Sequence, residues 1–446
     1  MSRRTVTGLI CTSGLQFADW TADYRFFSKE RFDPDVLFDA VRRGIIEHLD
    51  CDRPLVVAMD DSISRKRGSK IPGVAWRRDP MSPPFHANLV WGRRFIQISA
   101  ILPADRLDGP GRAIPIDFSH TATPVKPKTK APEQEWLEYR RERRKQSLSQ
   151  QGLERLHKLR SQMNCDGRND KPLHVVVDGS YTNGTVLKHL PKGTTLIGRI
   201  RRDARLHDLP DPRRDGTMGR TRRYGTTIIT PDDIRKDSSI SWKSASVFAA
   251  GKIHQMRYKA VDPLLWRPAG PDRHLRLVVI APLAYRPSRH SKLLYRHPAF
   301  LICTDPALAP EQILKAYVSR WDIEVNIRDE KQLIGFDQAQ VRCPTSARNA
   351  PALAVAAYSM LLLAAARAFG VNNLPAQLPP PKWRSSKPKP RPSTVDLLNH
   401  LRFELWGRAI HSSTFSHFAA PTAPPSKPQK LVPDLASTLF YARPGA

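Results

Sequence analysis

Four polar residues in the C-terminal third of the chain have spacings that place them on one face of a helix. They are Tyr317, Arg320, Glu324 and Lys331, and they lie in a stretch without proline or glycine before Gly335. At about 100° per residue, these spacings keep the four side chains within an arc of about 60°. On such a face a carboxylate can hold a metal ion while a phenol, a guanidinium and an ammonium hold phosphates. The spacing alone fits a salt-bridged, solvent-facing helix equally well.

Two further acids favour the catalytic interpretation. Asp60 ends LVVAMD and Asp178 ends LHVVVD, and each of these apolar runs predicts a buried strand. Acids at the ends of separate strands and on a late helix can meet at one point of a mixed sheet. Three carboxylates with little histidine or cysteine predict an oxygen-ligand site for Mg²⁺ or Mn²⁺, and a pair of such ions suits phosphoryl transfer. Any one of these acids alone is more often a turn former or a helix cap, so the combination carries the prediction.

The first acid has a neighbour that competes for its role. Asp61 follows Asp60, and alternation along a strand sends the two side chains to opposite faces, so only one should be a ligand. We favour Asp60 because it continues the apolar strand, and we interpret Asp61-Ser62 as the turn that follows. The sequence leaves the choice between the two acids open.

The elements around these residues predict a mixed α/β sheet with helices on its faces. HANLVW and RFIQISAIL, separated by Gly92-Arg93, predict an antiparallel hairpin, and residues 103–135 predict a loop. A charged helix with an apolar stripe is expected over residues 135–163. TLIGRI should pair beside the strand of the second acid, and a helix that begins at Pro310 should carry the four polar residues.

Composition indicates a polyanionic partner. Lys and Arg number 72 against 42 Asp and Glu, which gives a formal net charge of +30 and a pI near 10.4. Such an excess favours binding to nucleic-acid phosphates over a role in solubility. The Lys- and Pro-rich runs at 126–130 and 387–391 are weaker candidates for such contacts than a basic stretch near the middle of the chain. We expect nine arginines of that stretch to follow a phosphate backbone: Arg199, Arg201, Arg202, Arg205, Arg213, Arg214, Arg220, Arg222 and Arg223.

Cysteine usage and hydropathy bear on the cellular compartment. The five cysteines are scattered without metal-ligand spacing, which argues against zinc and fits a reducing compartment. No long apolar run follows the basic N-terminus as it would in a signal peptide. The apolar stretch 352–366 is shorter than the roughly 20 residues of a membrane span and predicts a buried core helix. We therefore expect a cytoplasmic, nucleoid-associated protein without a membrane partner.

In these motifs the chain resembles the DDE transposases of bacterial insertion sequences, in particular the insertion-sequence-four type. Tyr317, Arg320, Glu324 and Lys331 reproduce the Tyr-(2)-Arg-(3)-Glu-(6)-Lys signature of that type. MDDS resembles the first-acid motif, and VVVDGSYTN followed by LIGRIRRDARL resembles the second-acid region. KQLIGFDQAQVR resembles the sequence that follows the glutamate. The similarity covers roughly residues 50–370.

The resemblance implies an RNase H-like mixed sheet, flanked by helices, with a β-rich insertion between the second Asp and the Glu. It also implies metal-dependent cut-and-paste DNA transposition by a homodimer that holds two transposon ends. The expected parts are a short N-terminal helical segment, interpreted as a truncated DNA-binding domain (1–50), the first part of the core (51–200), the insertion (201–297), the second part of the core (298–372), and a linker, an amphipathic helix and a tail (373–446).

Roles follow from the resemblance residue by residue. Asp60, Asp178 and Glu324 would be the catalytic acids and would hold two Mg²⁺ or Mn²⁺ ions. The other three signature residues would hold phosphates near the cleaved DNA end. Trp321 could stack on a displaced base, although a buried core position is the favoured interpretation of this residue. Further DNA contacts are expected from Arg199, Arg201, Arg202 and Arg342.

Three other interpretations are open. A decayed or domesticated copy would bind DNA without cutting it, which the short N-terminal segment favours and the intact acids oppose. Another RNase H-like nuclease would share the acids but not the connection of the signature to transposon ends. A basic RNA-binding scaffold would have no catalytic site, so that alanine at Asp178 or Glu324 would leave its activities unchanged.

Overall fold

The computed structural model divides into two compact units. It describes residues 4–12, 15–47, 53–79, 82–83, 85–86, 88–103, 109–121, 123–212, 220–286, 288, 290–339, 341–374 and 391–409. The sheet unit comprises Arg42–Ser62 and Arg94–Val325, and the helical unit comprises Met1–Val41, Ile63–Arg93 and Asn326–Ala446.

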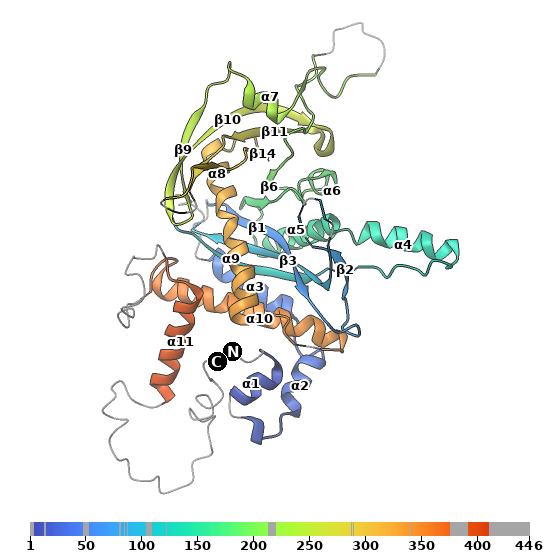
Figure 1. The fold of residues 1–446 in the computed structure, drawn as a ribbon, viewed down its shortest axis with the longest axis vertical. Helices are drawn as coiled ribbons and strands as arrows, with labels where there is room; N and C mark the ends of the chain where they lie inside the picture. The colour runs from blue at the N-terminus through green and yellow to red at the C-terminus, as the bar shows by residue number, and fades with distance from the viewer. Residues whose placement is uncertain are drawn as a thin grey trace. The chain divides into compact units, whose positions relative to one another are not determined.

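A mixed sheet forms the centre of the sheet unit (Figure 1). Its hydrogen-bonded order runs β3-β1-β5-β6-β14-β11-β10. The pairs β1–β5 and β5–β6 are parallel, and β6–β14, β14–β11 and β11–β10 are antiparallel. The strands are β1 (Leu55–Arg65), β3 (Leu89–Leu102), β4 (Arg112–His120), β5 (Leu173–Val177), β6 (Thr194–Arg199), β9 (Lys243–Ala249), β10 (Lys252–Trp266), β11 (Gly270–Ile280) and β14 (Ala299–Cys303). The predicted mixed α/β class is confirmed.

The two strands that lead to the aspartates are buried where they pair, except at His174. Leu55–Met59 of β1 lie beside Leu173–Val177 of β5, and nearly all of these side chains are apolar and inaccessible. Parallel strands that are covered on both faces have continuous apolar runs of this kind, which explains why the sequence predicts them correctly. The expected pairing of TLIGRI beside β5 is also confirmed, because β6 pairs with β5 in parallel.

The helices of the sheet unit pack on the sheet or on one another. They are α4 (Glu133–Lys145), α5 (Leu148–Cys165), α6 (Gly184–Lys188), α7 (Pro231–Lys236), α8 (Pro310–Ser319) and α9 (Trp321–Asp329). The single helix expected over residues 135–163 is wrong, because the backbone of Ser147 is extended and its Oγ accepts the Gln150 N–H at 3.3 Å, which begins α5. The apolar stripe was predicted to consist of Leu153, Leu156, Leu159 and Met163, and all four are buried in α5.

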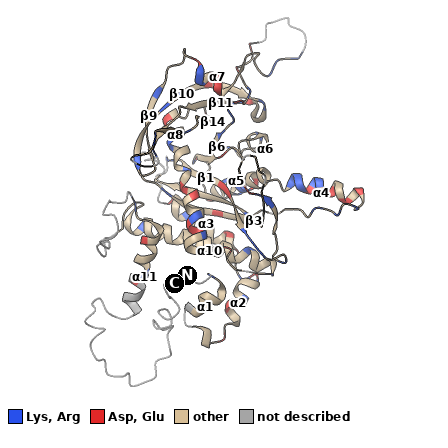
Figure 2. Cartoon of the chain, in the orientation of Figure 1, with Lys and Arg blue, Asp and Glu red and all other residues tan. Residues whose placement is uncertain are grey.

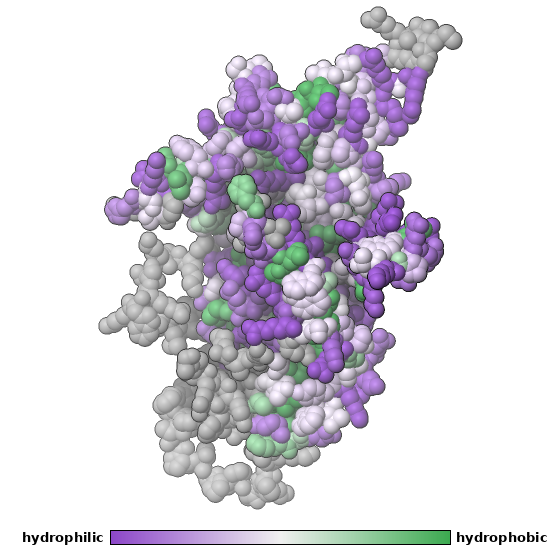
Figure 3. Space-filling view, turned by 45° about the vertical axis from the view of Figure 1, so that its right-hand side comes forward, coloured by the Kyte–Doolittle hydropathy of each residue, from purple (hydrophilic) through white to green (hydrophobic). Residues whose placement is uncertain are grey.

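Helix α4 projects from the sheet unit with no buried residue (Figure 1). Lys and Arg are concentrated in its last two turns (Figure 2). The face of the molecule drawn in Figure 3 is largely hydrophilic, as the charge balance of the sequence requires.

The hairpin expected at Gly92-Arg93 is wrong. β3 continues through both residues, and its antiparallel partner is β4, which lies within the segment expected to be a loop. Gly92 is required for a different reason: a Cβ there would collide with the carbonyl oxygen of Ser64. A glycine inside a strand often marks such a close backbone approach rather than a turn.

Between β6 and β14 the chain adds mainly β structure. Besides β9–β11 it forms β7 (Leu206–His207), β8 (Ile228–Ile229), the 3₁₀ turn η2 (Arg267–Ala269), β12 (Ala284–Tyr285) and β13 (Leu294–Tyr295). β9 pairs antiparallel with β10, and β12 pairs with β13 apart from the main sheet.

The helical unit is organised around one long apolar helix. α10 (Pro344–Phe369) contacts α2 (Thr21–Ser28), the π-helical turn η3 (Glu330–Ile334) and α11 (Thr394–Ala409). The remaining elements are α1 (Val6–Thr12), η1 (Leu15–Phe17), α3 (Pro34–Ile46), which continues into the sheet unit, and β2 (Ala75–Arg78). By length and composition α10 would suffice to cross a membrane, a test that the core helix of a soluble protein also passes. The core of the expected linker (375–390) and the expected tail (410–446) lie outside the described residues.

Candidate functional site

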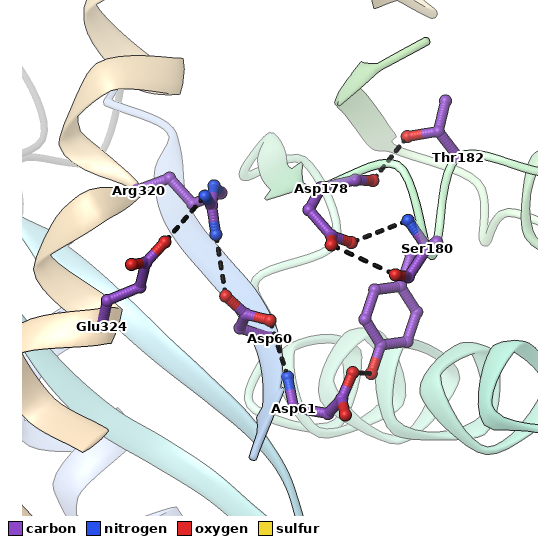
Figure 4. Close-up of polar contacts among 8 residues, drawn as sticks. Asp60, Asp61, Asp178, Ser180, Thr182, Arg320 and Glu324 are labelled. Carbon is purple, nitrogen blue, oxygen red and sulfur yellow. Dashed lines mark hydrogen bonds and ion pairs between the residues drawn. The ribbon is translucent and has the colours of Figure 1, made fainter. Parts of the chain in front are cut away.

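Two of the three acids lie side by side on neighbouring parallel strands. Met59 of β1 is in register with Val177 of β5, so the residues that follow them, Asp60 and Asp178, occupy matching positions. Neighbouring strands are about 4.8 Å apart, which brings the two carboxylates to one edge of the sheet (Figure 4). Burial and the charge of Asp178 raise the pKa of Asp60 to about 7, although Arg320 acts in the opposite direction.

The strand does not end at the first acid, which corrects the sequence-based interpretation. β1 runs to Arg65, so Asp61 lies within the strand rather than in a turn. As alternation requires, its carboxylate faces away from that of Asp60: Asp61 Oδ1 accepts the Tyr181 hydroxyl at 3.3 Å, and Oδ2 is 3.2 Å from Arg94 Nε. These two partners occupy Asp61 and leave Asp60 as the acid beside Asp178.

A tight turn after β5 fixes Asp178. Its Oδ1 accepts the Ser180 backbone N–H at 2.8 Å and its Oδ2 accepts the Ser180 hydroxyl at 3.1 Å, while its carbonyl oxygen accepts the Thr182 hydroxyl at 2.8 Å. An aspartate that bonds to the backbone two residues later is a common turn former, and Asp178 has this structural role. Its role as a metal ligand stays a prediction.

An arginine connects the third acid, Glu324, to Asp60. Arg320 donates from Nη1 to Asp60 Oδ2 at 2.8 Å and from Nη2 to Glu324 Oε1 at 3.0 Å (Figure 4). The arginine side chain is 13% exposed, that of Asp60 is 17% exposed and that of Glu324 is 35% exposed. Burial opposes the charge of Arg320, but Asp60, Tyr317, Glu324 and Asp178 together raise its pKa above the usual value. Its Nε is buried without a hydrogen-bond partner in the described part of the chain.

The uninterrupted helix expected to carry the four polar residues is wrong. α8 ends at Ser319 and α9 begins at Trp321, and the chain tightens at Arg320, where the Ile323 N–H bonds to the Arg320 carbonyl at 3.0 Å. Arg320 keeps right-handed helical dihedrals (φ −51°, ψ −31°), so the path of the chain stays helical through the junction. Arg320 is therefore the junction residue, with Tyr317 on α8 and Glu324 on α9.

Two aromatic residues flank this junction. The Arg320 guanidinium carbon is 5.9 Å from the centre of the Tyr317 ring, and burial raises the pKa of Tyr317 against the opposing effects of Arg320 and Arg199. Trp321 is 63% exposed, so the core position favoured for it is wrong. Its ring is accessible to a stacking partner.

The last signature residue lies in the helical unit. Lys331 is on η3, and its Nζ donates to the Ile63 carbonyl at 3.0 Å. Burial lowers the pKa of Lys331, and Arg65 also lowers it, while Glu330 raises it. Arg342, in the same unit, is exposed.

The basic stretch after β6 has exposed and paired members. Arg199 and Arg202 are exposed, and Arg201 pairs with Asp203 through two hydrogen bonds of 2.9 and 2.8 Å. Arg223 pairs with Asp272 at 3.1 Å. Arg213 and Arg214 lie outside the described residues.

The donor set suits a hard divalent cation, but the present arrangement is not a ligand cluster. Within the described ranges, no group of three or more Asp, Glu, His or Cys side chains is arranged to hold a metal ion. Carboxylate oxygens are the ligands that Mg²⁺ and Mn²⁺ prefer, and the raised pKa of Asp60 reflects mainly its burial, to which the charge of Asp178 adds. The guanidinium of Arg320 instead lies between Asp60 and Glu324 and bonds to one oxygen of each.

Sequence reasoning missed two residues that define the site. Tyr181 is fully buried, and burial together with Asp61, Asp60 and Asp178 raises its pKa well above the ordinary value. Tyr181 belongs to the VVVDGSYTN motif, but nothing in the sequence indicates that its hydroxyl donates to Asp61. Arg94 follows Gly92-Arg93, where a turn was expected, and its pairing with Asp61 depends on β3 lying beside β1.

Comparison with known families agrees with this geometry. Residues 136–360, half of the chain, match the family model described as the transposase DDE domain. Asp178, Arg320 and Glu324 lie within the matched residues, and Asp60 precedes them. A search of curated proteins found no match.

Proposed function

We propose that this chain, which belongs to the transposase DDE domain family, cuts DNA at transposon ends and transfers the freed ends into target DNA. The observation that carries the proposal is the register of β1 and β5, which sets Asp60 beside Asp178 and next to the helix junction of Arg320 and Glu324. The insertion-sequence-four type and the cut-and-paste route are part of the proposal.

The roles that we propose are those that the family resemblance implies, and the positions of Asp60, Asp178 and Glu324 support them. Asp60, Asp178 and Glu324 hold two Mg²⁺ or Mn²⁺ ions, which when bound supply activation of a water or 3′-hydroxyl and stabilisation of the leaving oxygen. Arg320 provides a planar fork that matches a phosphate, and the exposed Trp321 offers a surface for a displaced base.

DNA binding extends beyond this centre in our proposal. Lys331, Arg342, Arg199, Arg201 and Arg202 contact the phosphate backbone, and the net charge of +30 supports a polyanionic partner. A homodimer holds the two transposon ends, with the strands of residues 201–297 as an insertion in an RNase H-like core. The protein acts in the cytoplasm on nucleoid DNA.

A cleavage assay tests the function and the identity of the first acid together. The substrate is a plasmid that carries the gene's own flanking DNA, incubated with Mg²⁺ or Mn²⁺. We expect metal-dependent breaks at flanking inverted repeats, which Asp60→Asn and Glu324→Gln abolish. Asp61→Asn is the matched control, and it should keep cutting because Tyr181 and Arg94 occupy that carboxylate. Binding without cutting by the wild-type protein, or equal loss in Asp60→Asn and Asp61→Asn, would contradict the assignment.

A further inference from the structure

Arg320 holds oxygens on two of the three carboxylates that we propose as metal ligands. Its two terminal nitrogens donate to Asp60 Oδ2 at 2.8 Å and to Glu324 Oε1 at 3.0 Å. The guanidinium thereby neutralises part of the negative charge of the site. A cation at the same oxygens would lie a few Å from the guanidinium, where like charges repel strongly in a half-buried position.

The same guanidinium is suited to a phosphate. Arginine presents a rigid fork of N–H donors that matches the geometry of phosphate oxygens, and each such bond is charge-assisted. Arg320 Nε is buried and has no hydrogen-bond partner among the described residues, so the present arrangement does not use the whole donor set. The Tyr317 ring, 5.9 Å from the guanidinium carbon, can stay in contact with the cation after the carboxylates release it.

We propose that Arg320 is an exchangeable internal cation, which holds Asp60 and Glu324 in the DNA-free protein and releases them when a DNA phosphate binds its guanidinium. The inference rests on the proposed function, since it takes these carboxylates as metal ligands. Because one guanidinium cannot serve both partners fully, phosphate binding strengthens metal binding, and metal binding strengthens phosphate binding to the same extent. The complete site then forms only on DNA, which limits unwanted cutting.

The first test measures Mn²⁺ binding to the DNA-free protein. Free Mn²⁺ is followed by electron paramagnetic resonance during titration of the wild type, Arg320→Ala and Arg141→Ala. Arg141→Ala is the matched control, because it removes the same charge from an exposed arginine of α4, a helix with no buried residue and no assigned role in the site.

We expect Arg320→Ala to bind Mn²⁺ at least about tenfold more tightly than the wild type, because a charged hydrogen bond is worth about one power of ten or more. Arg141→Ala should stay close to the wild type. An increase in Mn²⁺ affinity distinguishes the two roles of Arg320. If the arginine only supported the fold, its removal would weaken Mn²⁺ binding. Arg320→Lys keeps the charge but cannot reach both carboxylates with two donors, so its affinity should be intermediate, and it serves if the alanine variant does not fold.

The second test measures the linkage to DNA. A random-sequence duplex should tighten Mn²⁺ binding to the wild type, and this effect should largely disappear in Arg320→Ala. Equal Mn²⁺ affinities for the wild type and Arg320→Ala, with weaker binding in Glu324→Gln, would overturn the exchange and leave the proposed function intact. No saturable Mn²⁺ binding to any variant, with or without the duplex, would remove the metal site and overturn both proposals.

Discussion

Asp337 lies between two buried cations in the helical unit, and its replacement by asparagine should strongly destabilise that unit. Asp337 Oδ1 is 3.0 Å from Lys66 Nζ and 2.8 Å from Arg93 Nη1. The side chain of Lys66 is 0% exposed, and those of Asp337 and Arg93 are each 1% exposed. Asparagine retains the size of the side chain and tolerates the left-handed backbone at this position (φ 57°), so the substitution removes mainly the charge.

The expected loss follows from what the two cations keep. Lys66 Nζ still donates to the backbone carbonyl of residue 337 and to the Ala339 carbonyl, the latter at 3.2 Å, and Arg93 still donates to the Ala347 carbonyl, but neither retains an anion from Asp337. Leaving one partner of a buried ion pair uncompensated costs about 3–5 kcal/mol, and here one substitution affects two cations. Asp79→Asn in the same unit is the control: Asp79 pairs at 2.7 Å with Arg65, which is 73% exposed, so its loss should cost at most about 1 kcal/mol.

Urea denaturation, followed by hydrogen exchange in peptides of the helical unit, measures both variants. The pH adds an independent check. Burial lowers the pKa of Lys66 below the usual 10.5, against the opposing effect of Asp337, so the unfolded chain binds the Lys66 proton more tightly than the folded chain. Stability therefore rises with pH between the folded pKa of Lys66 and 10.5. Without Asp337 the folded pKa of Lys66 falls further, so the stability of Asp337→Asn begins to rise at a lower pH than that of the wild type. The difference in unfolding free energy between the wild type and Asp337→Asn should therefore become smaller as the pH is raised towards 10.5. If Asp337→Asn lost no more unfolding free energy than Asp79→Asn, the reasoning would be refuted.

Two further predictions concern the sheet unit. A Cβ at Gly152 would lie 2.7 Å from the Tyr181 ring, so Gly152→Ala should cost about 1–3 kcal/mol in thermal unfolding, whereas Gly109→Ala, with no atom within 4 Å, should not. The Tyr258 hydroxyl donates to the Glu311 carboxylate, and this hydrogen bond is the main reason why the pKa of Glu311 lies below 4.5. The hydrogen bond therefore stabilises the fold fully above pH 4.5, and this stabilisation is lost as the pH falls through the folded pKa of Glu311. Tyr258→Phe should therefore lose less stability than the wild type between neutral and acidic pH, and equal acid sensitivity of their melting temperatures would contradict this.

The sequence predicts the buried centre of the fold because its signal is local. LVVAMD and LHVVVD are continuous apolar runs, and such runs form the covered parallel strands β1 and β5. Since both aspartates directly follow apolar residues that pair in register, the convergence of Asp60 and Asp178 could be inferred before the structure was seen.

The errors arise where long-range pairing outweighs a local turn signal. Asp61-Ser62 has turn residues, yet β1 continues through them. β4 was missed because the Pro- and Lys-rich run that follows it, TPVKPKTKAPE, led us to predict a loop over the whole of residues 103–135. Pro115 of β4 lies at the irregularity in the β3–β4 register, where a strand tolerates a proline. The pairing of Arg320 with Asp60 spans 260 positions, and spacing along a helix does not determine whether a guanidinium points to solvent or to a distant strand.

A site that cuts DNA must bring a phosphate to carboxylates that repel it. The excess of basic residues attracts DNA to the protein, but the charges of exposed residues such as Arg199 and Arg202 are largely screened beyond about 8 Å in physiological salt. Neutralisation must therefore come from a group among the acids themselves. Arg320 is half-buried against Asp60 and Glu324, where screening is weak, and it belongs to the helix junction that also carries Glu324. An arginine at this junction therefore bonds to both acids in the structure, and in our proposal the same guanidinium receives the phosphate.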